Sequence, residues 1–195
     1  MSVSTDIRRS EWAFHTDTGR SCLDFVATVG DRAHLAFDRW REPQDLARWC
    51  VEAGLLAQRP CVQPAHLKTA RGLRDAIYHT IVAVRGGERP RRSDVAQLNR
   101  WAGRPMPTPE LADDGRSATL RLDNPLEAVF TIVARDAIEL LTGPLLERTR
   151  QCAESSCSVL FVDTSRPGKR RWCSMSRCGN RRKKAAYRRR LRRAE

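Results

Sequence analysis

The sequence has no long hydrophobic run. No stretch approaches 18 consecutive apolar residues, the length that a membrane-spanning helix requires. The first residues, MSVSTDIRRSEW, also contain no apolar core of the kind found in secretory signals. We therefore expect a cytoplasmic protein without a membrane span. Thiols stay reduced in that compartment, which favours metal binding over disulfides where cysteines cluster.

Recognisable catalytic motifs are lacking too. The chain has no phosphate-binding glycine loop and no nucleophile motif, and its four histidines are scattered without metal-type spacing. We therefore predict that the protein is not an enzyme. A small-molecule pocket is a weaker expectation than simple aromatic packing in a core, and its candidate residues are Trp12, Phe14, Asp24 and Trp49.

Large apolar residues are scarce in the last 45 residues, so this part needs a metal or disulfides to be stable. The same stretch holds Cys152, Cys157, Cys173 and Cys178, spaced as two C-x4-C pairs with fifteen residues between them. Two close pairs joined by a short loop are typical of a tetrahedral site, and four thiolates favour one structural zinc ion. The other three cysteines lack paired spacing and are predicted to be small buried residues.

The positive charge is concentrated at one end of the chain. Residues 150–195 hold 15 basic and 3 acidic residues, whereas residues 1–149 hold 21 and 20. A helix with Arg or Lys on nearly every face repels itself unless anions neutralise it, and a nucleic-acid backbone supplies such anions. We expect DNA as the partner, with RNA as the alternative. The predicted contact residues are Arg166, Lys169, Arg170, Arg171, Asn180, Arg181, Arg182, Lys183, Lys184, Arg188, Arg189 and Arg190.

Three residues of this segment have competing interpretations. Arg166 can bind phosphate or hold a turn through Asp163. Asn180 can read adenine, but capping or bracing the start of the helix through its side chain is the favoured role. Trp172 stands beside a ligand cysteine and is expected to pack in the core of the small module rather than stack on bases.

Residues 1–148 are predicted to form an α+β, mainly helical domain with a small antiparallel sheet. Alternating apolar residues predict a strand over residues 23–29, paired with a hairpin over residues 105–122. Ser93 and Asn124 are predicted to cap two of the helices. The helices are expected over residues 43–53, 64–85, 93–101, 125–141 and, as a short piece, 145–150.

Residues 149–195 are predicted to form a treble-clef-like, four-cysteine zinc finger. A cysteine knuckle, a strand over residues 159–163, a turn, and a basic helix from residue 173 to about residue 193 follow one another in that order. Thiolates at a helix start are favourable, because the helix dipole and free amides stabilise negative charge.

Two stretches resemble known families. The string FVDTSRPGKRRWCSMSRCGNRRKKAAYRRR closely resembles the CGNR zinc finger, named after the tetrad at residues 178–181. The segments CLDFVATVG and DLARWCVEAGLL resemble the ABATE domain that usually precedes this finger, with Ala27 where that family commonly has Asn. The resemblance implies a bacterial, stress-linked transcription regulator.

We therefore expect a nucleoid-associated, DNA-binding regulator. Residues 1–148 would sense a small molecule, meet a partner protein or form a homodimer, which would help because one small finger buries little surface. Two alternatives stand beside this interpretation. One is an RNA-binding protein that uses the same module, and the other is an enzyme or small-molecule binder that the basic tail tethers to nucleic acid.

Overall fold

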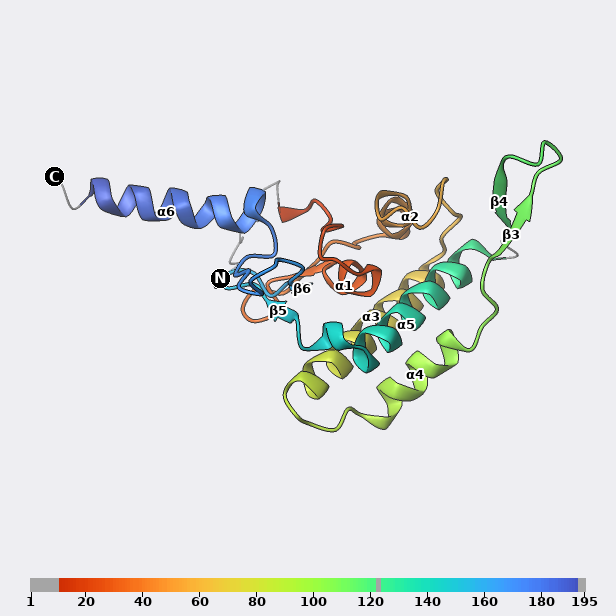
Figure 1. Cartoon of the computed structure of the whole chain (residues 1–195), viewed down its shortest axis with the longest axis horizontal. Coiled ribbons are helices and arrows are strands. Elements are labelled where there is room, and N and C mark those ends of the chain that lie inside the picture. The colour runs from red at the N-terminus through yellow and green to blue at the C-terminus, as the bar shows by residue number, and fades with distance from the viewer. Residues whose placement is uncertain (1–10, 122–123, 193–195) are drawn as a thin grey trace. The chain divides into compact units, whose positions relative to one another are not determined.

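The computed structural model describes residues 11–121 and 124–192 (Figure 1). These residues divide into two compact units. The finger unit consists of residues 11–39 and 145–192, and the helical unit of residues 40–144. The zinc-finger segment is therefore compact together with residues 11–39 rather than alone. The domain boundary expected at residue 148 stays a prediction.

The helical unit is built on α2 (Pro43–Glu52), α3 (Pro64–Arg85), α4 (Arg92–Ala102) and α5 (Pro125–Thr142). Helices α3, α4 and α5 lie side by side and pack on one another (Figure 1). The side chain of Asn124 caps α5, as predicted, by accepting hydrogen bonds from the N–H groups of Leu126 and Glu127 at 3.2 and 3.3 Å. The predicted cap of α4 is wrong, because Arg91 occupies its N-cap and Ser93 lies inside the helix.

The apolar stripes read from the sequence form the core of the helical unit. Leu73, Ile77 and Ile81 of α3 are fully buried, and so is Val133 of α5. These positions recur at helical spacing, so each helix turns one apolar face inward. Trp49 of α2 lies edge-on against the ring of Trp40, with 5.7 Å between ring centroids.

The hairpin is confirmed, but its predicted partner is wrong. Strands β3 (Thr108–Leu111) and β4 (Ala118–Arg121) pair antiparallel and form a two-stranded sheet of their own. Gly115, at φ 60°, makes the turn, and the carboxylate of Asp114 accepts hydrogen bonds from the N–H groups of Arg116 and Ser117.

The predicted strand over residues 23–29 is instead the helix α1 (Ser21–Val26) of the finger unit. Every residue from Cys22 to Val26 is buried, so no polar face marks the helical period. The Asp24 carboxylate accepts hydrogen bonds from the N–H and hydroxyl of Thr18 at 3.0 and 2.8 Å, which ties the preceding turn to the helix. Only Val29–Gly30 is extended, as β1, and it pairs with β2 (Phe37–Asp38).

The zinc-finger segment begins with a hairpin. Strand β5 (Thr149–Gln151) pairs antiparallel with β6 (Leu160–Val162). The predicted helical piece over residues 145–150 is therefore wrong beyond the short 3₁₀ helix η2 (Pro144–Leu146). A π-helical turn, η3 (Met175–Gly179), leads into the predicted basic helix, α6 (Asn180–Leu191). No helix within residues 11–121 and 124–192 is long and apolar enough to cross a membrane.

Residues 11–39 are joined to this segment by hydrogen bonds and by a shared core. The N–H of Val162 donates to the carbonyl of Thr18 at 2.8 Å, and the N–H of Arg32 donates to the hydroxyl of Ser158 at 2.7 Å. Ala27, which follows α1, is buried in one apolar cluster with three of the four candidate cysteine ligands. The zinc-finger segment thus shares its core with Ala27, the residue that follows α1.

Candidate metal centre and basic helix

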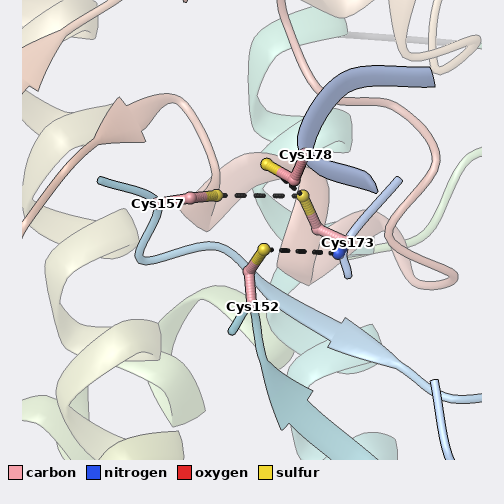
Figure 2. Close-up of side chains that lie close together, drawn as sticks. All are labelled: Cys152, Cys157, Cys173 and Cys178. Atoms are coloured by element: carbon pink, nitrogen blue, oxygen red, sulfur yellow. Dashed lines mark hydrogen bonds between the residues drawn. The ribbon is translucent and has the colours of Figure 1, made fainter. Parts of the chain in front are cut away.

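Four cysteines from two loops converge in the finger unit (Figure 2). Cys152 and Cys157 lie in the connection between β5 and β6, whereas Cys173 precedes η3 and Cys178 lies within it. All four Sγ atoms lie within 4.8 Å of one another. The Sγ–Sγ distance is 3.8 Å between Cys157 and Cys173 and 3.6 Å between Cys173 and Cys178. The structure therefore brings the whole predicted ligand set together.

These spacings fit a zinc ion and do not fit disulfides. Sulfurs about 2.3 Å from a tetrahedral zinc ion lie about 3.8 Å apart, whereas disulfide-bonded sulfurs lie about 2.0 Å apart. The four cysteines are free thiols, three of them buried and Cys157 half-buried. The cluster forms one zinc site, and because protein thiolates fill all four positions it is a structural one.

Backbone hydrogen bonds set the shape of the two ligand loops. The N–H of Cys157 donates to the carbonyl of Glu154, and the N–H of Cys152 donates to that of Val159, each at 2.9 Å. The N–H of Cys173 donates to the sulfur of Cys152 at 3.5 Å (Figure 2), which stabilises negative charge on that sulfur. These bonds hold the two ligand loops in the geometry that the metal site requires.

The four thiols cannot all ionise without a cation. The pKa of Cys152 lies far below that of a free thiol, because its sulfur accepts hydrogen bonds from the thiols of Cys157, Cys173 and Cys178. The pKa of Cys173 is raised far above it, because hydrogen bonds to Cys152, Cys157 and Cys178 hold its proton. A divalent metal resolves this conflict, since it binds all four as thiolates and displaces their protons.

Arg170 holds the loop between the two cysteine pairs. Its guanidinium donates to the carbonyls of Trp172 and Cys173 and lies 4.6 Å from the centroid of the Phe161 ring. Its N–H donates to the buried Asp163 carboxylate at 2.8 Å. Bonds from the Ser165 hydroxyl, then from the backbone, lower the pKa of Asp163. Arg170 was predicted to contact nucleic acid, and its guanidinium already has these structural partners.

The other residues of the predicted nucleic-acid set differ in whether their side chains already have partners within the protein. Arg181 forms an ion pair with Glu11 and donates to the hydroxyl of Ser156 at 3.1 Å. Gly179 occupies the N-cap of α6, so the predicted cap by Asn180 is wrong, and Asn180 is exposed. The side chain of Arg189 lies outside the described residues. The exposed basic residues are Arg166, Lys169, Arg171, Arg182, Lys183, Lys184, Arg188 and Arg190.

Two family models match the chain and together span most of it. Residues 19–144 match the ABATE family, described as "Putative stress-induced transcription regulator". The chain belongs to the ABATE family. Residues 148–191 match the CGNR zinc finger, which contains the four-cysteine cluster. No curated protein matches the chain.

The four candidate pocket residues of this ABATE-family chain belong to different units: Trp12, Phe14 and Asp24 to the finger unit and Trp49 to the helical unit. Phe14 is buried, Trp12 lies edge-on to Phe37 at 5.3 Å between centroids, and Asp24 is bonded to Thr18. Trp49 belongs to the core of the helical unit. Their role in ligand binding stays a prediction.

The single-residue expectations for the ABATE-family chain are mostly met. Trp172 packs against the buried cysteine cluster, as expected, with the guanidinium of Arg171 5.1 Å from its ring centroid. Cys22 and Cys50 are buried as predicted, and burial raises the pKa of Cys50 to about 12. Cys61 is exposed, so its prediction is wrong. Arg166 does not hold Asp163 among the described contacts, where Ser165 and Arg170 do so.

Sequence reasoning missed two arginines, Arg39 and Arg177, whose side chains hold the main chain of residues 11–14, and of the two only Arg177 belongs to the CGNR finger. Arg39 is almost fully buried and donates to the carbonyls of Ala13 and Ala27 at 3.1 and 2.9 Å. Arg177, between the last two ligands, donates to the carbonyls of Ala13 and Phe14 at 3.2 and 2.6 Å. Burial, together with the charge of Arg177, lowers the pKa of Arg39 to about 10, so it stays protonated at neutral pH. No local pattern predicts such long-range bonds.

Proposed function

We propose that this protein is a zinc-dependent, DNA-binding transcription regulator of the cytoplasm, associated with the nucleoid. The observation that carries the proposal is α6, a helix of exposed basic residues that starts where the last zinc ligand lies. Zinc contributes folding energy, and the helix contributes positive charge. The family description supports the regulatory part of the proposal.

Isolated, α6 would be a marginal helix. It is 12 residues long and rich in like charges, and both its length and its charge repulsion oppose helix formation in water. Its two largest apolar residues, Tyr187 and Leu191, are 63% and 49% exposed, so packing supplies little compensation. Polyanion binding would offset the repulsion, which is why we assign the helix to nucleic acid.

Several basic side chains of α6 are available for phosphate. Arg182, Lys183 and Arg190 are exposed and have no ion-pair partner in the described part of the chain. Long-range attraction between these side chains and the DNA backbone would give affinity with little sequence preference, and arginine would add base contacts in a groove.

One small finger buries little surface, so we propose that the protein binds as a homodimer. No catalytic step is part of the proposal, and the helical unit would receive a small-molecule or protein signal.

The test compares nucleic acids at matched salt. Full-length zinc-loaded protein is titrated into labelled duplex DNA and into a structured RNA of equal length, and binding is followed by fluorescence anisotropy. We expect tighter binding to DNA, and selection from a random duplex pool should then recover a preferred site. Tighter binding to RNA would replace the proposal with the RNA-binding alternative, and no binding to either would refute both.

A further inference from the structure

A cavity of about 340 Å³ lies within the finger unit. Its walls come from residues 11–39, from the loop that carries Cys157, and from η3 and α6. We call it the basic cavity, because the basic residues that line it are Arg39, Arg177, Arg181, Lys184 and Arg188, against the acidic residues Glu11 and Asp31. It shares no residue with the helical unit.

The two acidic residues have partners elsewhere in the wall or its loop. Glu11 forms the ion pair with Arg181. The carboxylate of Asp31 lies 3.0 Å from Nδ1 of His34 and accepts a hydrogen bond from the N–H of Leu35 at 3.4 Å. Neither Lys184 nor Arg188 has an ion-pair partner in the part of the chain that the structure describes. The cavity therefore keeps uncompensated positive charge.

One face of α6 forms a wall of the basic cavity. Arg181, Lys184, Ala185 and Arg188 line it, and their spacing of three, four and seven residues places them on one side of a helix. Ala185 contributes a short side chain to this wall, next to the long basic side chains of Lys184 and Arg188. Arg182, Lys183 and Arg190 are not part of the lining. The helix thus has two basic faces, of which one borders the basic cavity.

Another part of the lining is partly apolar and contains an arginine held by hydrogen bonds. Arg39 is fixed by its bonds to main-chain carbonyls, and its guanidinium lies 4.8 Å from the centroid of the Phe37 ring. Val159 adds apolar surface. His15 is 5% exposed, and its Nδ1 has no hydrogen-bond partner among the described residues, the Asp17 carboxylate being 4.0 Å away. A fixed positive charge, apolar surface and a buried polar atom without a hydrogen-bond partner are typical of a small-molecule site.

We propose that the basic cavity binds a small phosphorylated molecule. Lys184 and Arg188 would hold its phosphate, and the wall formed by Phe37 and Val159 would contact its organic part. The volume lies near the lower end of ligand pockets, which begin at about 300 Å³, and exceeds what a lone phosphate ion needs. The proposal goes beyond the proposed function, because it holds whether or not the outer face of α6 binds DNA.

The first experiment uses no nucleic acid. Isothermal titration calorimetry of the full-length zinc-loaded protein with adenosine monophosphate and with pyrophosphate should show one bound ligand per chain for at least one probe. The double variant Lys184→Gln/Arg188→Gln should weaken that binding by about tenfold or more, because it removes both cations that would hold the phosphate. The matched control, Lys183→Gln/Arg190→Gln, removes the same charge outside the cavity and should change affinity by less than about twofold.

Two outcomes would overturn the proposal. Equal weakening by both double variants would show diffuse attraction to the helix rather than a site. Absence of saturable probe binding, combined with a larger loss of duplex DNA affinity in the cavity variant than in the control, would assign the cavity to a phosphate of the nucleic-acid backbone instead. Zinc content and circular dichroism of both variants should match those of the unmodified protein, since the four substituted residues are exposed.

Discussion

At the scale of single residues, Gly30 and Phe37 control how β1 and β2 meet. A Cβ atom on Gly30 would lie 2.2 to 2.9 Å from three carbons of the Phe37 ring. That ring cannot simply swing away, because Trp12 lies edge-on to it and the guanidinium of Arg39 covers it. Glycine at position 30 is therefore required by space, and any side chain there must displace an aromatic ring.

We expect Gly30→Ala to destabilise the finger unit by about 1–3 kcal/mol, as overpacking commonly does. Urea unfolding would measure the loss. Gly72→Ala is the matched control, because its Cβ would meet only the flexible end of Gln97, at 3.1 Å, inside α3. Alanine favours a helix interior over glycine, so the control should be neutral or stabilising by up to about 1 kcal/mol. Equal destabilisation by both substitutions would contradict the steric explanation.

His15 makes stability depend on pH. Burial, and then the charges of Arg177 and Arg39, lower its pKa from 6.5 to about 3. The unfolded chain therefore takes up a proton before the folded chain does, and stability falls as pH drops below about 6.5 towards 3. Between about pH 7.5 and about pH 5.5 this group should cost the folded state about 1.4 kcal/mol.

Urea unfolding of the His15→Gln variant at both pH values measures that contribution. The variant should lose about 1.4 kcal/mol less than the unmodified protein over this interval. Both proteins carry the same four cysteines, so any loss of zinc on acidification affects them alike and cancels in the comparison. The same pH dependence in both would mean that His15 can take up a proton in the folded state.

At the scale of elements, the sequence predicts best where a pattern repeats. The periodic apolar residues of α3 and α5 locate both helices, and Asn124 marks the first turn of α5. α1 escapes prediction because all five residues from Cys22 to Val26 are buried. A helix that is covered on every side has no polar face to reveal its period, and alternating residues within it imitate a strand.

The residues of the candidate site also fall into two groups, those that the sequence predicts and those that it does not. A zinc site of four thiolates is built from cysteines at short spacing, so Cys152, Cys157, Cys173 and Cys178 are visible in the sequence. Arg39 and Arg177 hold main-chain carbonyls of residues 13, 14 and 27. Every residue has a main-chain carbonyl, so a hydrogen bond to that group does not constrain which residue supplies it. Such contacts depend on tertiary structure alone, and no sequence motif predicts them.

Zinc removal should therefore affect more than the zinc-finger segment. We expect Cys173→Ser to release the ion and to unfold the finger unit, including α1, because Ala27 and Phe161 share a core with the cysteines. The helical unit, residues 40–144, has its own core and should stay folded. Hydrogen exchange read by mass spectrometry would show fast exchange in residues 11–39 and 145–192 only.

Cys61→Ser is the control for that experiment, since Cys61 is exposed and lies far in sequence from the ligand loops. It should keep one zinc ion per chain and the original exchange pattern. Retained protection of α1 in Cys173→Ser would show that residues 11–39 fold independently of the metal. Loss of protection in the helical unit as well would show that the two units unfold as one.

At the scale of the whole molecule, the charge is divided unevenly. The net charge is +13, of which residues 1–149 contribute almost nothing. Positive charge that is spread over a surface attracts a polyanion weakly at every point of that surface. Positive charge that is concentrated on one helix neutralises several DNA phosphates at one place and releases their counterions there. The location of the basic residues, rather than their total number, should therefore set the salt dependence of DNA binding.

Two variants of equal charge test this salt dependence. Arg182→Gln/Arg190→Gln removes two exposed cations from α6, and Arg89→Gln/Arg91→Gln removes two from the loop before α4. Removing one cation that binds a DNA phosphate should flatten the plot of log binding constant against log salt by about 0.9, so the slope should change by about 1.8 in the α6 variant and by nearly nothing in the loop variant. Anisotropy titrations at several salt concentrations give both slopes. Equal flattening in the two variants would mean that total charge governs binding, and α6 would then have no special part in the interface.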